Sequence, residues 1–90
     1  MLTPAERKAL KAKAHKLDPV VQIGAQGLSD AVIAEIDGAL RAHGLIKVRA
    51  GSLDRAARAR VFDSIRVKTG AEAVQQVGKV CVLYRRKPGA

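Results

Sequence analysis

The stretch of sequence that decides the fold is residues 20–30, Val-Val-Gln-Ile-Gly-Ala-Gln-Gly-Leu-Ser-Asp. The first four of these residues are nearly all apolar, which predicts a short buried strand over residues 20–23. The next four form a GxxG loop, in which glycine permits a sharp turn where a Cβ would clash, and lets a bulky partner approach the main chain. A helix that begins at Ser29 or Asp30 directs its free N–H groups and its positive dipole end toward this loop.

This order of strand, GxxG loop and helix start is a place where a phosphate backbone can be held. The alternative is a plain strand-to-helix turn, because an isolated GxxG motif is common. The rest of the chain has to decide between these two interpretations.

Composition favours a polyanionic partner. The 90 residues contain 17 Lys and Arg against 8 Asp and Glu, which gives a net charge of +9. Positive charges in such excess repel one another, which suggests a polyanionic partner such as nucleic acid. An anionic membrane surface is the alternative partner. No stretch is long enough to span a bilayer, and no signal peptide is evident, so we expect a cytoplasmic protein. The single cysteine, Cys81, excludes an internal disulfide.

Caps and periodicity predict the remaining elements. Thr3, Pro4 and Glu6 form a capping box that starts a helix running to about Lys16, with Leu10, Ala14 and Leu17 as its apolar stripe. Further helices are expected over 29–43 and 53–69, ended by glycine, and further strands over 45–50, 72–77 and 79–85. The buried side of the helix over 29–43 is predicted to hold the following residues: Val32, Ile33, Ile36, Ala39, Leu40 and His43.

The predicted fold is a single α/β domain with the order α-β-α-β-α-β-β and a small four-stranded mixed sheet. Right-handed crossovers place the helices over 29–43 and 53–69 on the same face of that sheet. The other face is then at least partly open, and Lys47 and Arg49 either point outward from it or lie at an edge. The strand order is left undecided by the sequence. We expect the domain to span residues 1–86, followed by a flexible tail over residues 87–90.

Catalytic chemistry has few candidates. His15 and His43 are far apart and fit no metal-ligand pattern, so both are interpreted as structural or surface residues. Cys81 alternates with apolar strand residues, as a structural thiol does. The sequence therefore predicts no enzyme, metal, cofactor or small-molecule substrate.

Nucleic-acid binding has more support. The segments 1–17 and 46–70 are strongly basic, whereas residues 18–45 are acidic. Tyr84 alone cannot form a platform on which bases stack, so we expect contacts to the backbone and strong salt dependence. A GxxG loop flanked by cations is similar to the loop with which KH domains clamp a nucleotide backbone.

Residues spread along nearly the whole chain resemble the CRM domain, the YhbY-like family of RNA-binding proteins. The matching positions are Lys11, Ala14, His15, Leu17, Pro19, Val20, Ile23, Gly24, Gly27 and Leu28, then Glu35–Asp37, Ala39, Leu40, His43 and Leu45–Val48, and finally Gly78–Val80 and Val82–Arg85.

The resemblance implies a fold similar to the C-terminal domain of bacterial translation initiation factor three. It also implies association with ribosomal RNA in precursors of the large subunit, as an assembly factor. We expect the protein to be a monomer. The resemblance assigns RNA contact to Gly24, Ala25, Gln26, Gly27, Lys11 and His15. On charge alone we add Lys8, Lys16, Lys47 and Arg49.

The loop departs from the family in one respect. Its interior is Ala25-Gln26, where family members often carry a basic residue, so either the contact is weaker or the lysines of the first helix supply the charge. Two other functions stay open, a general DNA-binding protein and a protein–protein adaptor with a basic docking face.

Overall fold

The chain folds in the predicted order of elements. A computed structural model describes residues 2–86, so the expected tail over residues 87–90 lies outside the described residues. The elements are α1 (Pro4–Ala14), β1 (Val21–Gln22), α2 (Asp30–His43), β2 (Leu45–Arg49), α3 (Arg55–Thr69), β3 (Glu72–Val77) and β4 (Val80–Tyr84).

Local signals account for where the helices begin and end. The Thr3 hydroxyl accepts from the Glu6 amide at 3.1 Å while the Glu6 carboxylate accepts from the Thr3 amide at 3.0 Å, which is the predicted capping box. Ser29 caps α2, and Asp54 caps α3 by accepting from the Ala57 amide at 2.8 Å. The helices α2 and α3 both end at a glycine with positive φ.

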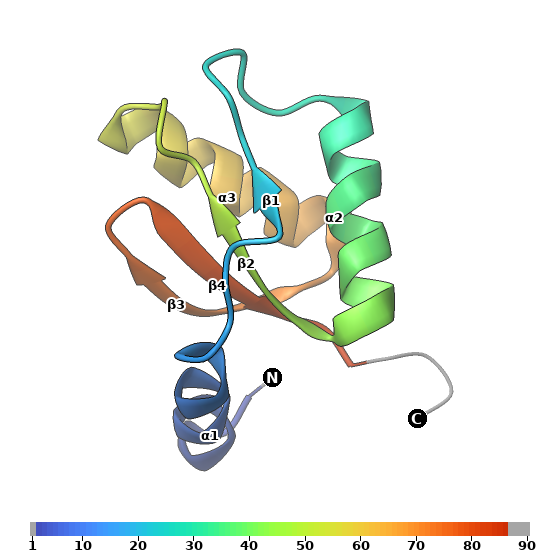
Figure 1. The fold of residues 1–90 in the computed structure, drawn as a ribbon, viewed down its shortest axis with the longest axis vertical. Coiled ribbons are helices and arrows are strands. Elements are labelled where there is room, and N and C mark those ends of the chain that lie inside the picture. Colours follow the sequence, from blue (N-terminus) through green and yellow to red (C-terminus); the bar gives the residue numbers. More distant parts are fainter. Residues whose placement is uncertain (1, 87–90) are drawn as a thin grey trace.

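The four strands form one mixed sheet with the order β1-β2-β4-β3. Strand β1 pairs with β2 in parallel, and the other two pairs are antiparallel. This arrangement brings three connections to one end of the sheet: the loop after β1, the loop after β2 and the β3–β4 turn (Figure 1). The parallel pair places the carboxyl ends of β1 and β2 side by side, and Arg49 of β2 pairs with Val80, which follows the turn.

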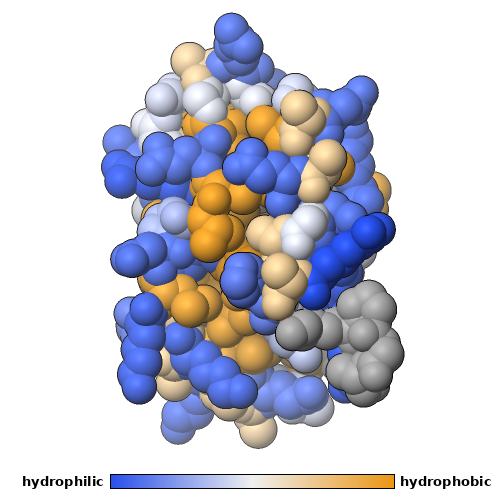
Figure 2. Space-filling view, turned by 45° about the vertical axis from the view of Figure 1, so that its right-hand side comes forward, coloured by the Kyte–Doolittle hydropathy of each residue, from blue (hydrophilic) through white to orange (hydrophobic). Residues whose placement is uncertain are grey.

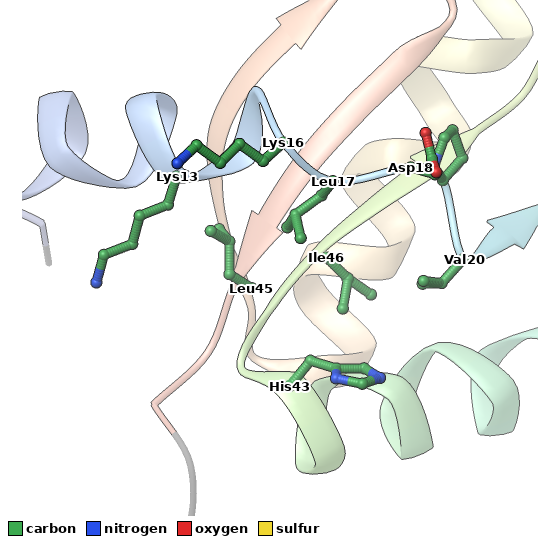
Figure 3. Close-up of a pocket in the computed structure, with 9 residues that line it drawn as sticks. Lys13, Lys16, Leu17, Asp18, Val20, His43, Leu45 and Ile46 are labelled. Atoms are coloured by element: carbon green, nitrogen blue, oxygen red, sulfur yellow. The ribbon is translucent and has the colours of Figure 1, made fainter.

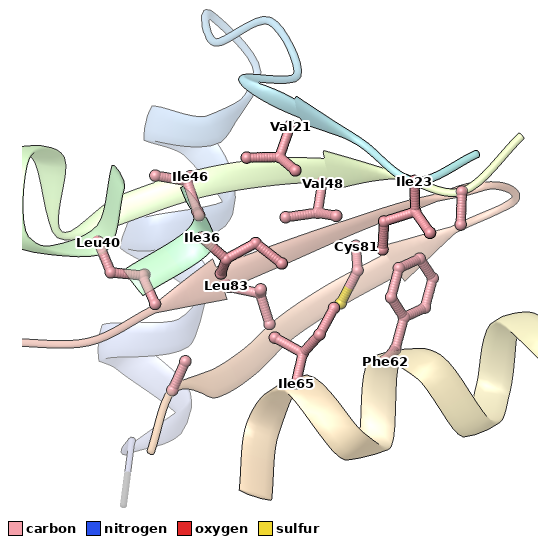
Figure 4. Close-up of a cluster of buried hydrophobic side chains, with 12 residues drawn as sticks. Val21, Ile23, Ile36, Leu40, Ile46, Val48, Phe62, Ile65, Cys81 and Leu83 are labelled. Atoms are coloured by element: carbon pink, nitrogen blue, oxygen red, sulfur yellow. The ribbon is translucent and has the colours of Figure 1, made fainter. Parts of the chain in front are cut away.

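The main core lies between one face of the sheet and the helices α2 and α3, as predicted. Ile36 and Leu40 of α2 and Ile65 of α3 are fully buried against strand residues such as Val48 and Leu83 (Figure 4). Cys81 belongs to this core, and burial raises the pKa of its thiol to about 11. The thiol is therefore structural, as its alternation with apolar residues predicts.

Helix α1 covers only part of the other face. Ala14 packs on Val74 and Val82 in a second, smaller core. The Arg7 guanidinium donates to the carbonyls of Ala73 and Val74 at 2.6 and 3.1 Å, where β3 shifts its register. These contacts fix α1 across one end of the sheet and leave the other end of this face without a helix (Figure 1).

Several details of the prediction were wrong, among them the start of α3, which begins at Arg55 and not at Leu53. Helix α1 ends at Ala14 instead of Lys16, so Leu17 lies outside the helical stripe and is 37% exposed. The strand β1 is shorter than expected, because Val20 still belongs to the linker and is 48% exposed. His43 is exposed and does not join the buried side of α2, because the chain turns at Gly44 into β2 and residues 41–43 face solvent.

Candidate nucleic-acid interface

The part of the sheet that α1 leaves uncovered carries cations from β2. Paired residues of neighbouring strands project from the same face, so Lys47 lies on the face of Val82, the side on which α1 packs. Arg49 follows two residues later and projects from the same face. We call this surface the open sheet face and define it by Gln22, Lys47, Arg49, Gln75, Val77 and Val80.

Helix α1 forms one wall of a hollow on this face. Lys11 and His15 line the hollow together with Lys47, Gln75 and Val80. Its volume is about 470 Å³. The structure therefore brings Lys11, His15 and Lys47 together, although they come from segments far apart in the sequence.

Two of the other predicted cations do not join them. Lys8 is exposed on α1 and is not among the residues that line this hollow. Lys16 lies beyond the end of α1 and lines a different hollow, on the opposite side of the α1–β1 linker.

Arg49 lies toward the end of the sheet that carries the GxxG loop. The Ile23 amide donates to the Arg49 carbonyl at 2.7 Å, one residue before Gly24. The Arg49 side chain lies over Gly51, where a Cβ would come within 3.1 Å of its Nε. The absence of a side chain at position 51 thus lets the guanidinium lie back against the loop that follows β2.

The GxxG loop is a solvent-exposed turn. The Gly27 amide donates to the Gly24 carbonyl at 3.0 Å, and residues 24–26 are exposed. The amides of Ala25 and Gln26 make no backbone hydrogen bond, so they can donate to a ligand. The expectation that both glycines avoid a clash was wrong for Gly24, where a Cβ would meet nothing within 4 Å and φ is not positive. Only Gly27 needs glycine for its backbone, which has a φ of +78°.

The loop and α1 lie at opposite ends of the molecule. Figure 1 shows the loop after β1 at the top and α1 at the bottom, with the strands between them. The predicted site residues thus do not form one compact cluster. Lys11, His15, Lys47, Arg49 and the loop instead follow one another along the open sheet face.

Several other cations are held by structural contacts. The Arg85 guanidinium donates to Asp37 at 2.6 Å and to the Thr69 carbonyl at 2.7 Å, and its hydrogen bond lowers the pKa of the Asp37 carboxyl. Arg58 donates to the Leu53 carbonyl. By contrast, within residues 2–86 the side chains of Lys11, Lys47 and Arg49 have no carboxylate partner.

One cation near the loop was missed. Lys79 occupies the β3–β4 turn, and its carbonyl accepts from the Ala50 amide at 2.8 Å, which places it at the same end of the sheet as the loop. The Gly78-Lys79 turn was visible in the sequence, but its position at the same end of the sheet as the GxxG loop follows only from the strand order.

The described residues contain no group of three or more His, Cys, Asp or Glu side chains suited to a metal ion. Within the same part of the chain, no helix is long and apolar enough to cross a membrane.

The chain is similar to proteins of known family. A model of the CRS1/YhbY (CRM) domain matches residues 2–85. A protein of Haemophilus influenzae named RNA-binding protein is 42% identical over 84 residues, which cover 93% of this chain and 85% of the relative. A protein of Methanocaldococcus jannaschii named a probable RNA-binding protein is 39% identical over 90 residues, which cover 98% of this chain and 66% of the relative.

A solved structure agrees with the fold. The solution structure of a hypothetical protein from Staphylococcus aureus superimposes with a TM-score of 0.82 at 32% sequence identity, and the match covers 97% of this chain and 91% of that one. The fold, the match over residues 2–85 and the identity to these relatives agree, and the chain belongs to the CRS1/YhbY (CRM) domain family.

Proposed function

We propose that this protein binds RNA along the open sheet face, from α1 to the GxxG loop. The observation that carries the proposal is the convergence of Lys11, His15 and Lys47 on one hollow, with Arg49 next to them on the way to the loop. The names of the relatives support RNA as the ligand. The same names favour binding without catalysis.

The side chains and the loop have different roles in this proposal. The cations of the face neutralise phosphates and release counterions, which makes the affinity dependent on salt. The Ala25 and Gln26 amides donate to phosphate oxygens, and the glycines flanking them let the backbone approach. Arg49 and Lys79, at the same end of the sheet, supply the charge that the loop interior lacks.

We further propose that the RNA is ribosomal RNA in precursors of the large subunit, which is the partner implied by the family resemblance. The protein would act there as a ribosome assembly factor. The test is crosslinking in cells followed by sequencing of the attached RNA, and crosslinks dominated by other RNA classes would contradict this part of the proposal.

The binding face is tested with a matched pair of double variants. Lys47→Gln with Arg49→Gln removes two charges from the open sheet face, and Arg55→Gln with Lys68→Gln removes two exposed charges from α3. The first variant should lower the dependence of log K on log salt by about 1.4–1.8, because each lost phosphate contact contributes about 0.7–0.9. The second should leave this slope nearly unchanged. Equal slopes for the two variants would place the RNA elsewhere.

The alternative functions predict different outcomes. A DNA-binding protein would prefer duplex DNA in competition with RNA at fixed salt. An adaptor that docks an acidic protein would still sediment with ribosomes after nuclease treatment, whereas binding through RNA would be lost.

A further inference from the structure

The linker between α1 and β1, residues 15–20, crosses the sheet above β2. The Val20 amide donates to the Lys47 carbonyl at 3.0 Å, which fixes the end of the linker to that strand. Leu17, Asp18 and Pro19 line two hollows, one on each side of the linker. One of them belongs to the open sheet face. The other faces α2 and has no part in the RNA-binding proposal.

We call this second hollow the linker groove. It has a volume of about 510 Å³, and its lining includes Lys13, Lys16, Leu17, Val20, His43 and Ile46. Figure 3 shows Leu17, Val20 and Ile46 around its centre, with Lys13 and Lys16 on the α1 side and His43 on the opposite wall. The centre is therefore aliphatic, and most of its charge lies at one end.

Two apolar side chains of the groove are accessible to solvent, whereas Ile46 is buried beneath them. Leu17 is 37% and Val20 48% exposed, which is unusual for large hydrophobic residues of this chain. On this side of the molecule, Figure 2 shows an apolar stripe along the long axis, bordered on both sides by hydrophilic residues. A contiguous apolar surface with a polar rim is typical of a site where another molecule docks.

The charged side chains at the edge of the groove indicate which kind of molecule can bind there. Lys13 and Lys16 have no carboxylate partner within residues 2–86. A neighbouring hollow shares Lys13, His43 and Leu45 with the groove and adds Arg86, so a third cation borders the same end. The carboxylate on the lining of the groove is Asp18, near Val20 and away from these lysines (Figure 3). The surroundings thus favour carboxylates beside apolar side chains.

We propose that the linker groove binds a short acidic segment of another protein. Two apolar side chains of that segment fill the space between Leu17, Val20 and Ile46, and flanking carboxylates pair with Lys13 and Lys16. RNA fits this groove less well, because unpaired bases are held by stacking on rings or guanidinium planes and the centre of the groove is aliphatic. A second copy fits less well, because each chain has a net charge of +9.

The test uses the full chain in the cells from which it comes. The photo-crosslinking residue p-benzoylphenylalanine replaces Val20 in the groove or, as the matched control, Val67, which is 78% exposed on α3. We expect a nuclease-resistant protein adduct at position 20 and not at position 67. Mass spectrometry should assign it to a segment in which Asp and Glu outnumber Lys and Arg and which contains at least two large apolar residues.

Charge reversal completes the test. Lys13→Glu with Lys16→Glu should lower the adduct yield at least fivefold, while Arg55→Gln with Lys68→Gln should leave it unchanged, because those residues lie on α3 and line neither hollow. Thermal unfolding of each variant verifies that it folds. The proposal is overturned by an adduct with RNA or with a second copy, by a yield no higher than at position 67, by insensitivity to the lysine reversal, or by an equal loss of the adduct in the Arg55 and Lys68 variant.

Discussion

Alanine substitution of Gly24 and Gly27 distinguishes the contribution of each glycine to folding stability from its contribution to RNA affinity. At Gly24 a Cβ would meet nothing within 4 Å, and the backbone does not have a positive φ. Gly24→Ala should therefore be neutral or stabilise the fold by up to about 1 kcal/mol, because alanine restricts the unfolded chain. At Gly27, where φ is +78°, alanine should cost about 1–2 kcal/mol.

These free energies can be measured by thermal unfolding. For a domain of this size, 1 kcal/mol shifts Tm by about 4–8 °C, so the two variants should move in opposite directions or differ clearly. Gly38→Ala is the matched control, because position 38 lies on the exposed side of α2 and a Cβ there also meets nothing within 4 Å. It should stabilise the helix by about 0.5–1 kcal/mol.

RNA affinity is then measured for the same three variants by filter binding. If the sugar–phosphate chain approaches Gly24, Gly24→Ala should weaken binding while the fold stays intact, and Gly24→Asp should weaken it by at least about tenfold, or 1.4 kcal/mol. Gly38→Ala should bind as the wild type does. Unchanged affinity in both Gly24 variants would refute the role of the loop, and a Gly24→Ala variant that unfolds more easily than Gly27→Ala would refute the backbone argument.

Three further predictions concern the scaffold. Ile65→Ala should lower the free energy of unfolding by about 2–5 kcal/mol, measured in urea, because it empties a fully buried site between α3 and the sheet. Cys81 should react with a thiol reagent at pH 8 only after unfolding, because burial raises the pKa of its thiol to about 11, and equally fast labelling of native and unfolded chains would contradict this. Asp37→Asn should destabilise the fold at neutral pH, because it removes the pairing with Arg85 that lowers the pKa of the Asp37 carboxyl in the folded state. A carboxyl with a lowered folded pKa stabilises the fold above its ordinary pKa of 3.8, and this stabilisation is lost as the pH falls through the folded pKa. Urea titrations at several pH values should therefore show the difference between the variant and the wild type shrinking over that range.

The sequence predicts the elements well, because the signals that define them act over a few residues. The capping box of Thr3 and Glu6 and the glycines that end α2 and α3 all lie where the pattern places them. The alternation over residues 45–50 also assigns Ile46 and Val48 to the core and Lys47 to the other face. The end of α1 was harder to predict, because Lys16 and Leu17 continue the helical pattern while the chain has already turned toward β1.

The candidate site was predicted only as a set of residue types. Lys11, His15 and Lys47 were named from motif and charge, and the structure brings them together, but it places Lys8 and Lys16 elsewhere. Lys79 was not named, since nothing in its own neighbourhood shows that the β3–β4 turn lies at the same end of the sheet as the GxxG loop.

By itself, the sequence determined which segments become helices and strands, which side of each is apolar, and that the surface is strongly basic. Only the tertiary structure decided that β4 inserts between β2 and β3, that α1 covers just one end of the sheet, and that the linker divides two hollows of different character. The physical reason is the range of the interactions. Caps and periodicity act between residues three or four apart, whereas strand order depends on pairing between residues as distant as Arg49 and Val80.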